Sequence, residues 1–297
     1  MNIEFSNLDF ASPGFSLANA RICLQAAADA YLNAECGARS AESGAQPAEF
    51  RISDSSTDTH VLLRQFGPAL IVAFRGSASL RNWLTDFDAH KQAIATSHVH
   101  EGFYRAALSV RDELRDAIAK SNADTVCFTG HSLGGALAVV MAWLLGEGRD
   151  GRLPSLNSES EISGTATRHP SPASIHSVYT FGQPRVGDAA FARDAGGLGC
   201  VNAPTSHGSD AALPSTLAAR LFRVTNRADV VPWVPGYVMG YRHFGNHIHL
   251  DALGLHENFP MTAELLVNGL EIYREFRRGE LALLADHAVA SYQEALR

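Results

Sequence analysis

The most constraining feature of this chain is the segment at residues 125–135, T-V-C-F-T-G-H-S-L-G-G. An apolar β-type run leads into the pattern G-x-S-x-G, and a helix-forming run, A-L-A-V-V-M-A-W-L-L, follows it. A strand, a sharp turn and a helix in this order are the context in which G-x-S-x-G presents a nucleophilic serine. Gly130 and Gly134 let the two arms of the turn pass close together, because neither carries a Cβ. We therefore predict that Ser132 is a nucleophile held at the head of a helix.

The same turn predicts part of an oxyanion site. The backbone N–H of Leu133 and the N-terminus of the following helix face the position of the Ser132 hydroxyl, so negative charge that develops there would be stabilised. A glycine-rich surface turn can give the same five residues by chance. The flanking strand and helix are what favour the catalytic interpretation.

A nucleophilic serine requires a base, and the base requires an acid that orients it. In the α/β-hydrolase fold, these residues follow the serine in the order Asp or Glu, then His. The acid is expected just after a core strand. Residues 221–224 alternate between two faces as a strand does, and Asp229 falls in the turn that follows. Asp188 and Asp210 are the alternatives, but neither follows so clear a strand.

The base is one of the histidines downstream of Asp229, which are His243, His247, His249, His256 and His287. His287 stands at the start of a C-terminal helix-forming run, where Asp286 is a good N-cap. His243 lies in Y-R-H-F-G-N-H-I-H-L-D, which reads as a short hairpin. The residues alone do not decide between His287 and His243.

The hairpin segment also offers a competing metal site. Its possible ligands are His243, His247, His249 and Asp251, of the nitrogen and oxygen types that zinc accepts. The spacing is a weak match to known metal motifs, and a hairpin with solvated histidines explains it equally well. We therefore predict no metal site and no cofactor.

Six ordered motifs carry a resemblance through most of the chain. They are A-F-R-G-S-A-S-L-R-N-W-L-T-D-F at 73–87, V-H-E-G-F at 99–103, F-T-G-H-S-L-G-G-A-L-A at 128–138, V-Y-T-F-G-Q-P-R-V-G-D at 178–188, the Asp229 segment and the terminal D-H-A-V-A-S-Y. Together they resemble the class 3 (fungal-type) lipase family, the family of the Rhizomucor and Thermomyces lipases, and suggest a bacterial-type member. The resemblance implies an α/β-hydrolase fold with a central mostly parallel or mixed sheet, helices on both faces and a lid over the active site.

The resemblance also implies roles for particular residues. The catalytic histidine of the family comes late in the chain, which favours His287 as the partner of Ser132 and Asp229. Ser77, in R-G-S, is then expected to supply a second oxyanion donor beside Leu133.

The family's lid begins just after that serine and carries a tryptophan, which implies a lid at residues 78–88 with Trp83 near its centre. The segment has an apolar face of its own at helical spacing, made of Leu80, Trp83, Leu84 and Phe87. Such a face can cover an apolar cleft in water and be buried elsewhere at a lipid surface. An ordinary surface helix packed on the core would show the same pattern.

Composition bounds the remaining possibilities. A chain of 297 residues that is 46% hydrophobic can bury one substantial core, so we expect a single domain over 1–297. Residues 147–176 and 195–218 are rich in small and polar residues and read as loop insertions. The net charge of −7 argues against nucleic acid as a partner, and no apolar run approaches the length of a transmembrane segment.

The N-terminal residues show no basic and apolar pattern of a signal peptide, and the four cysteines are widely spaced. We therefore expect a cytoplasmic location, or secretion by a route that needs no signal peptide. The sequence predicts a serine hydrolase that cleaves the ester bonds of lipids, a triacylglycerol lipase acting at an oil–water or membrane interface. The alternatives are a phospholipase A1, a soluble carboxylesterase, or a catalytically silent lipid-binding protein of the same fold.

Overall fold

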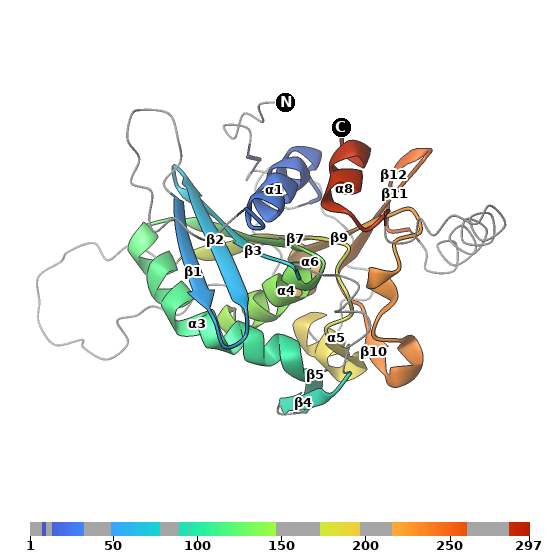
Figure 1. Ribbon diagram of the computed structural model, residues 1–297, viewed down its shortest axis with the longest axis horizontal. Coiled ribbons are helices and arrows are strands. Elements are labelled where there is room, and N and C mark those ends of the chain that lie inside the picture. The colour runs from blue at the N-terminus through green and yellow to red at the C-terminus, as the bar shows by residue number, and fades with distance from the viewer. Residues whose placement is uncertain are drawn as a thin grey trace, which may run out of the picture.

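A mixed β-sheet separates two layers of helices and forms the centre of the molecule (Figure 1). The computed structural model describes residues 8–9, 14–32, 49–77, 89–94, 96–146, 173–196, 216–259 and 285–297. Within these ranges the main sheet has eight strands in the order β1-β2-β3-β6-β7-β9-β11-β12. Their bounds are β1 Glu49–Asp54, β2 Thr59–Phe66, β3 Ala69–Phe74, β6 Thr125–His131, β7 Ser174–Phe181, β9 Leu221–Asn226, β11 Asn246–Asp251 and β12 Gly254–Glu257.

The strands of the main sheet run in both directions. β1, β2 and β3 form an antiparallel meander, β3, β6, β7, β9 and β11 are parallel neighbours, and β12 returns antiparallel to β11 at the edge. Because parallel neighbours share their carboxyl ends, the turns after β3, β6, β7 and β9 meet at one edge of the sheet. The three turns that follow β3, β6 and β9 hold the predicted site residues Ser77, Ser132 and Asp229.

Two apolar cores lie on opposite faces of the sheet. α3, Glu101–Ser121, and α4, Leu133–Leu145, pack on one face, while α1, Leu17–Asp29, and α8, Val289–Ala295, cover the other. The side chains of β9 alternate as expected, since Leu221 belongs to the first core whereas Phe222 and Val224 belong to the second. The arrangement matches the mixed sheet with helices on both faces that the sequence predicts.

A smaller sheet lies beside the main one, in the order β10-β8-β5-β4. Its strands are β4 Lys91–Ile94, β5 Ser97–His100, β8 Gly187–Asp188 and β10 Tyr241–Arg242. Two short helices lie between β8 and β9, first α5, Ala189–Gly196, and then α6, Leu217–Arg220. Two 3₁₀ turns lie between β9 and β10, first η2, Val231–Trp233, and then η3, Tyr237–Met239.

Two local predictions are wrong. Residues 241–251 are not a hairpin, because β10 belongs to the smaller sheet and β11 to the main one, where it pairs in parallel with β9. Asp286 does not cap α8, whose N-cap is Ala288. Its carboxylate accepts the backbone N–H of Ala228 at 3.3 Å instead.

The two predicted loop insertions, 147–176 and 195–218, include the start of β7 at Ser174, the end of α5 at Gly196 and the start of α6 at Leu217, and their role as insertions stays a prediction. The remainder of both segments, 147–172 and 197–215, lies outside the described residues.

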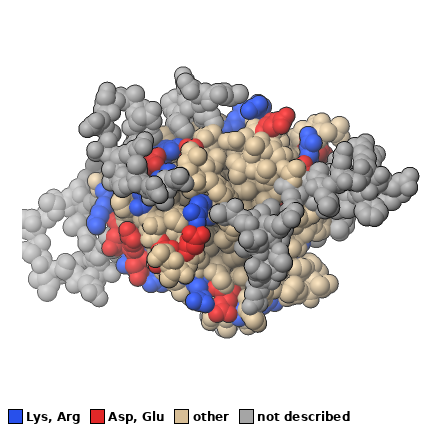
Figure 2. Space-filling model, in the orientation of Figure 1, with Lys and Arg blue, Asp and Glu red and all other residues tan. Residues whose placement is uncertain are grey.

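Charged side chains of both signs are interspersed over the face shown in Figure 2, without a broad field of one sign. Within the described ranges, every helix is too short or too polar to span a bilayer.

Candidate active site

Ser132 occupies a sharp turn between β6 and α4. Its backbone has φ 58° and ψ −130°, a conformation that L-residues rarely adopt, and the residue is only 2% exposed. A Cβ on Gly130 would collide with the Gly134 carbonyl group, and one on Gly134 would collide with the Phe74 carbonyl oxygen. The turn therefore requires glycine at both positions, and Ser132 is held at the N-terminus of α4, where Leu133 is the first helical residue.

The chain that follows β3 runs directly against this turn. Gly76 has no room for a side chain, because its Cβ would collide with the Tyr31 hydroxyl and the His131 carbonyl oxygen. Ser77, the predicted second oxyanion donor, is the next residue and is partly buried. The structure thus brings Ser77 and Leu133 to the same region around Ser132.

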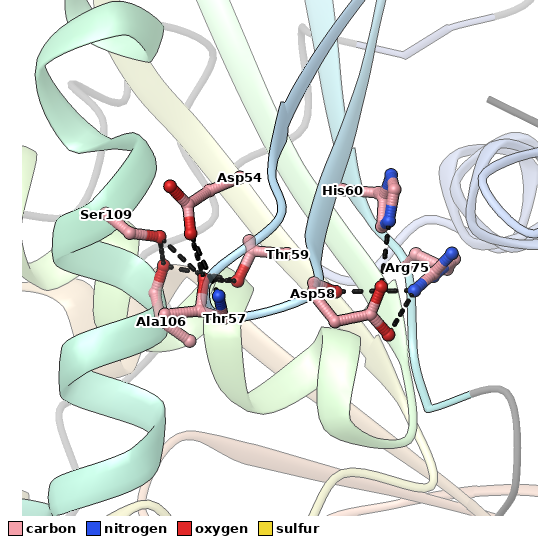
Figure 3. A network of polar contacts seen from close by, with 8 residues as sticks. All are labelled: Asp54, Thr57, Asp58, Thr59, His60, Arg75, Ala106 and Ser109. Atoms are coloured by element: carbon pink, nitrogen blue, oxygen red, sulfur yellow. Dashed lines mark hydrogen bonds and ion pairs between the residues drawn. The ribbon is translucent and has the colours of Figure 1, made fainter. Parts of the chain in front are cut away.

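A polar network fixes the start of this segment (Figure 3). Arg75 donates its backbone N–H to the His60 carbonyl at 3.0 Å, and its guanidinium forms an ion pair of 2.7 Å with Asp58. The Asp58 carboxylate also contacts the His60 ring nitrogen at 3.1 Å. Although partial burial opposes ionisation, these two partners hold the pKa of Asp58 below its usual value. The β1–β2 turn therefore anchors the residue two positions before Ser77.

Asp229 and His287 form a buried pair although they are 58 residues apart in sequence. Each is 2% exposed, and the His287 Nδ1 lies 2.9 Å from Oδ1 and 2.8 Å from Oδ2 of Asp229. Since the carboxylate accepts the hydrogen bond, Nδ1 carries the proton and Nε2 is left as the basic nitrogen. Nε2 is buried and has no hydrogen-bond partner among the described residues. A base with an open acceptor nitrogen is the arrangement that proton abstraction requires.

The Asp229 carboxylate is fixed by two further donors. The backbone N–H of Val231 donates to Oδ1 at 2.9 Å, and the Tyr292 hydroxyl donates to Oδ2 at 2.6 Å. Two donors on one carboxylate set its orientation. Asp229 is thereby held in place to orient the His287 ring.

Gly182 connects the pair to the serine turn. The Ser132 backbone N–H donates to the Phe181 carbonyl at 2.8 Å, and the next residue is Gly182. A Cβ on Gly182 would lie 2.7 Å from Asp229 Oδ2 and 2.8 Å from the His287 Nδ1. The peptide that receives the Ser132 amide therefore passes directly against the acid and the base. The Ser132 turn and the Asp229–His287 pair are thus neighbours on either side of the Phe181–Gly182 peptide.

The other candidates from the sequence lie elsewhere. Asp188 accepts the Phe191 backbone N–H at 2.8 Å and contacts His98 at 2.9 Å, whereas Asp210 lies outside the described residues. His243 donates from Nε2 to the Pro232 carbonyl at 2.7 Å and forms no hydrogen bond with Asp229 among the described contacts.

The histidines of residues 243–251, the candidate metal ligands, form hydrogen bonds with protein groups. The Thr225 hydroxyl lies 2.8 Å from His247 Nε2 and 2.9 Å from His249 Nδ1, and the His247 Nδ1 donates to the Phe259 carbonyl at 3.0 Å. Burial, aided by the nearby Arg223, lowers the pKa of His247 to about 3, and burial lowers that of His249 to about 4. In the described part of the chain, no cluster of three or more His, Cys, Asp or Glu is placed to hold a metal ion. The hydrogen bonds and the lowered pKa values of His247 and His249 are those of neutral histidines that pack against protein groups.

The predicted lid, residues 78–88, lies outside the described residues, and so do its apolar side chains Leu80, Trp83, Leu84 and Phe87. Its role stays a prediction.

Comparison with known proteins decides the family. The family described as "Lipase (class 3)" matches residues 71–239, which is more than half of the chain. The chain belongs to the class 3 lipase family. This confirms the family predicted from the six motifs, while the bacterial type of the member stays a prediction.

Three curated relatives show the extent of the similarity. A lipase of Rhizomucor miehei is 30% identical over 209 residues, which are 68% of this chain and 46% of the relative. A secreted mono- and diacylglycerol lipase of Fusarium solani is 27% identical over 68% of this chain and 50% of its own length. The secreted mono- and diacylglycerol lipase A of Penicillium cyclopium is 29% identical over 65% and 53%. This class 3 lipase thus spans about half the length of the curated relatives it matches.

Solved structures agree on the fold. A mutant of MDLA from Penicillium cyclopium superposes with a TM-score of 0.59 at 22% identity, covering 85% of this chain and 88% of that one. The Rhizomucor miehei lipase in its propeptide complex gives a TM-score of 0.51 at 25% identity, covering 71% of this chain and 60% of that one. The α/β-hydrolase fold class predicted from the sequence is confirmed.

The cytoplasmic location predicted from the sequence is wrong. Two of the three relatives above are named secreted lipases, which point to an extracellular location. Part of the error has a physical reason. The prediction interpreted the widely spaced cysteines as free thiols and free thiols as typical of a reducing compartment. Cys23 and Cys127 are free but fully buried, and burial raises the pKa of Cys127 to about 11. A buried thiol of this kind is inert, and so it does not report on the redox state outside.

Sequence reasoning missed a second set of contacts around the class 3 lipase site. The Tyr31 hydroxyl donates to the His131 Nδ1 at 2.9 Å, and the His131 Nε2 donates to the His287 carbonyl at 2.6 Å. Burial, reinforced by the neighbouring His287, lowers the pKa of His131 to about 3, so this ring is neutral and can accept at one nitrogen while it donates at the other. The position of His131 within G-H-S-L-G was a usable signal, whereas nothing local in the sequence marked Tyr31.

We expect Tyr292→Phe to lower kcat about tenfold with a smaller change in KM. The change removes a charge-assisted hydrogen bond to Asp229, a kind of bond worth about 1.5–3 kcal/mol, and leaves the ring packing in place. Steady-state kinetics on a soluble ester measure the effect. Tyr179→Phe is the matched control, because its buried hydroxyl accepts from the Ser16 backbone N–H at 3.0 Å and does not contact the acid. Equal losses in kcat for the two variants would contradict a positioning role for Tyr292.

Proposed function

We propose that this chain is a serine hydrolase that cleaves carboxylic ester bonds of lipids, with triacylglycerols as the principal substrate class. The observation that carries the proposal is the buried Asp229–His287 pair, whose imidazole lies 4.5 Å, centroid to centroid, from the ring of His131, the residue before Ser132. Membership of the class 3 lipase family supports the same chemistry.

The first half of the reaction is acyl transfer to the enzyme. The Ser132 Oγ attacks the ester carbonyl carbon while the His287 Nε2 takes the hydroxyl proton. Asp229 holds the Nδ1 proton and stabilises the positive charge that the imidazole gains. When the tetrahedral intermediate collapses, the C–O bond to the leaving alcohol breaks and His287 passes its proton to that alcohol.

The second half repeats these steps with water. His287 removes a proton from water, the hydroxide attacks the acyl-enzyme carbonyl, and the proton returns to Ser132 as the fatty acid leaves. In both halves we assign the oxyanion to the backbone N–H groups of Ser77 and Leu133. The N-terminus of α4, 13 residues long, adds a favourable dipole at the same position.

A second candidate changes only the substrate. The relatives from Fusarium solani and Penicillium cyclopium are named mono- and diacylglycerol lipases, which favours partial glycerides over triacylglycerols. Both candidates are consistent with an extracellular enzyme that meets its substrate at a lipid–water interface, as the secreted relatives suggest.

A hydrolysis panel separates these candidates from the alternatives. The purified chain is assayed on tri-, di- and monoacylglycerols, a phospholipid and short p-nitrophenyl esters, and a fluorophosphonate reagent reports the reactive serine. Preferred release of fatty acid from triacylglycerol supports the first candidate, and preference for partial glycerides supports the second. Hydrolysis of short esters alone would refute both, as would the absence of any turnover and labelling.

A further inference from the structure

Three consecutive apolar side chains project from η3. Tyr237 is 54% exposed, Val238 is 96% exposed and Met239 is 50% exposed. We call these three residues the apolar tip. Large apolar side chains scattered singly over a protein surface are ordinary, but a run of three on one short turn marks a surface that is buried against something.

The backbone under the apolar tip is held by two cationic side chains. The Arg242 Nη1 donates to the Tyr237 carbonyl at 2.9 Å and to the Tyr241 carbonyl at 2.8 Å. The Lys91 Nζ donates to the Met239 carbonyl at 2.7 Å. These hydrogen bonds fix both ends of the three-residue turn. Its side chains are therefore presented at little further cost in backbone entropy.

The same two cations place positive charge beside the apolar tip. The Arg242 guanidinium lies 3.3 Å from the centroid of the Tyr237 ring, and the Lys91 ammonium lies 4.8 Å from that of Tyr241. The whole chain carries a net charge of −7, so this local pair of cations runs against the overall balance. Apolar side chains at the tip with cations at the base form the pattern of an interfacial anchor that favours anionic lipid.

The apolar tip is also connected to the candidate active site. It follows Asp229 in the chain after a loop of seven residues, 230–236. The Arg185 Nη1 holds this loop by donating to the Trp233 carbonyl and to the Pro235 carbonyl, the latter at 2.8 Å. The Tyr241 hydroxyl donates to the Ala89 carbonyl at 3.0 Å. Ala89 is the first described residue after 78–88, and Tyr241 follows the apolar tip by two residues.

We propose that the apolar tip inserts into an anionic lipid surface while Lys91 and Arg242 contact its headgroups. The proposal deepens the proposed function and rests on it, since it names the surface that docks the enzyme on its substrate phase. A lipid surface fits better than a protein partner. Three side chains fall well short of the roughly 1,000 Å² that specific protein interfaces bury, whereas shallow insertion requires no more than a few apolar groups.

Vesicle binding tests the proposal without depending on catalysis. The full chain carrying Ser132→Ala, which cannot consume lipid by the proposed chemistry, is sedimented with phosphatidylcholine vesicles, with or without about one quarter phosphatidylglycerol. We expect tighter binding to the anionic vesicles, weakened by added salt. In this background Val238→Ser, and independently Met239→Ser, should lower the affinity for both vesicle types roughly tenfold. Lys91→Gln should lower binding about fivefold more on anionic vesicles than on neutral ones, because it removes a charge as well as the hydrogen bond to Met239.

Leu253→Ser is the matched control. Leu253 is 89% exposed on the β11–β12 turn, so the change removes similar apolar surface away from η3. Its affinity should stay within about twofold of the parent, since a surface change outside the contact alters little. The proposal is overturned if the parent ignores both vesicle types, if Val238→Ser and Met239→Ser bind like the parent, or if Leu253→Ser loses as much. A wild-type protein without ester turnover would refute the proposed function but leave this result intact.

Discussion

Replacing Ser132 with alanine should lower kcat for ester hydrolysis by at least about 10³-fold while the protein stays folded. The loss is large because no acyl-enzyme can form, and only the oxyanion donors and substrate binding remain. The fold should tolerate the change. Ser132 is 2% exposed, its side chain does not cap α4, and alanine meets the same strain at φ 58° that serine already bears.

The measurement combines kinetics on a soluble ester with labelling by a fluorophosphonate. The wild-type chain should be labelled and Ser132→Ala should not. Ser109→Ala is the control. Ser109 lies in α3, where its hydroxyl bonds the Thr57 side chain of the β1–β2 turn and the Ala106 carbonyl of its own helix. Near-normal turnover by folded, uncontaminated Ser132→Ala would remove Ser132 from the mechanism.

The parts of this fold that could be predicted are those that local patterns encode. The sequences V-L-L-R-Q-F at 61–66 and A-L-I-V-A-F at 69–74 are typical of strands and lie within β2 and β3, and the turn between them has Gly67 at a positive φ of 55°. The G-x-S-x-G turn was equally predictable. A Cβ on Gly130 would collide with Gly134 four residues later, and a Cβ on Gly134 would collide with the end of the neighbouring β3. The position of Asp229 was predictable too, because the alternation of residues 221–224 marks the strand β9 that precedes it.

The parts that could not be predicted depend on contacts between distant residues. β11 pairs in parallel with β9 instead of folding back on β10, and no turn signal within 241–251 encodes that choice. Asp286 has the side chain of a good N-cap, yet it bonds the backbone of Ala228. Burial raises the pKa of the Asp286 carboxyl, while the hydrogen bond from Ala228 acts in the opposite direction. The helix-capping propensity of Asp286 is therefore overridden by its contact with the turn after β9.

The choice of base shows the same limit more sharply. His243 and His287 are equivalent by residue type, and only the resemblance to the lipase family favoured His287. Their surroundings differ in the folded chain. His287 faces an ionisable carboxylate, whereas His243 faces the Pro232 carbonyl, with Arg223 and Arg185 nearby. Burial and these two cations lower the pKa of His243, so a further positive charge there is disfavoured.

His287→Ala should be nearly as damaging to kcat as Ser132→Ala, because the members of a triad act as a unit. Without the imidazole, the Ser132 proton has no acceptor, and the buried Asp229 loses the group that it orients. His243→Ala is the matched comparison, since it also removes an imidazole, one that is partly buried and bonded to a backbone carbonyl. It should reduce stability while kcat per folded molecule stays within about tenfold. The two variants are compared by kcat after the folded fraction has been measured. The reverse ranking would mean that the buried pair is structural and that the base lies on the loop before β11.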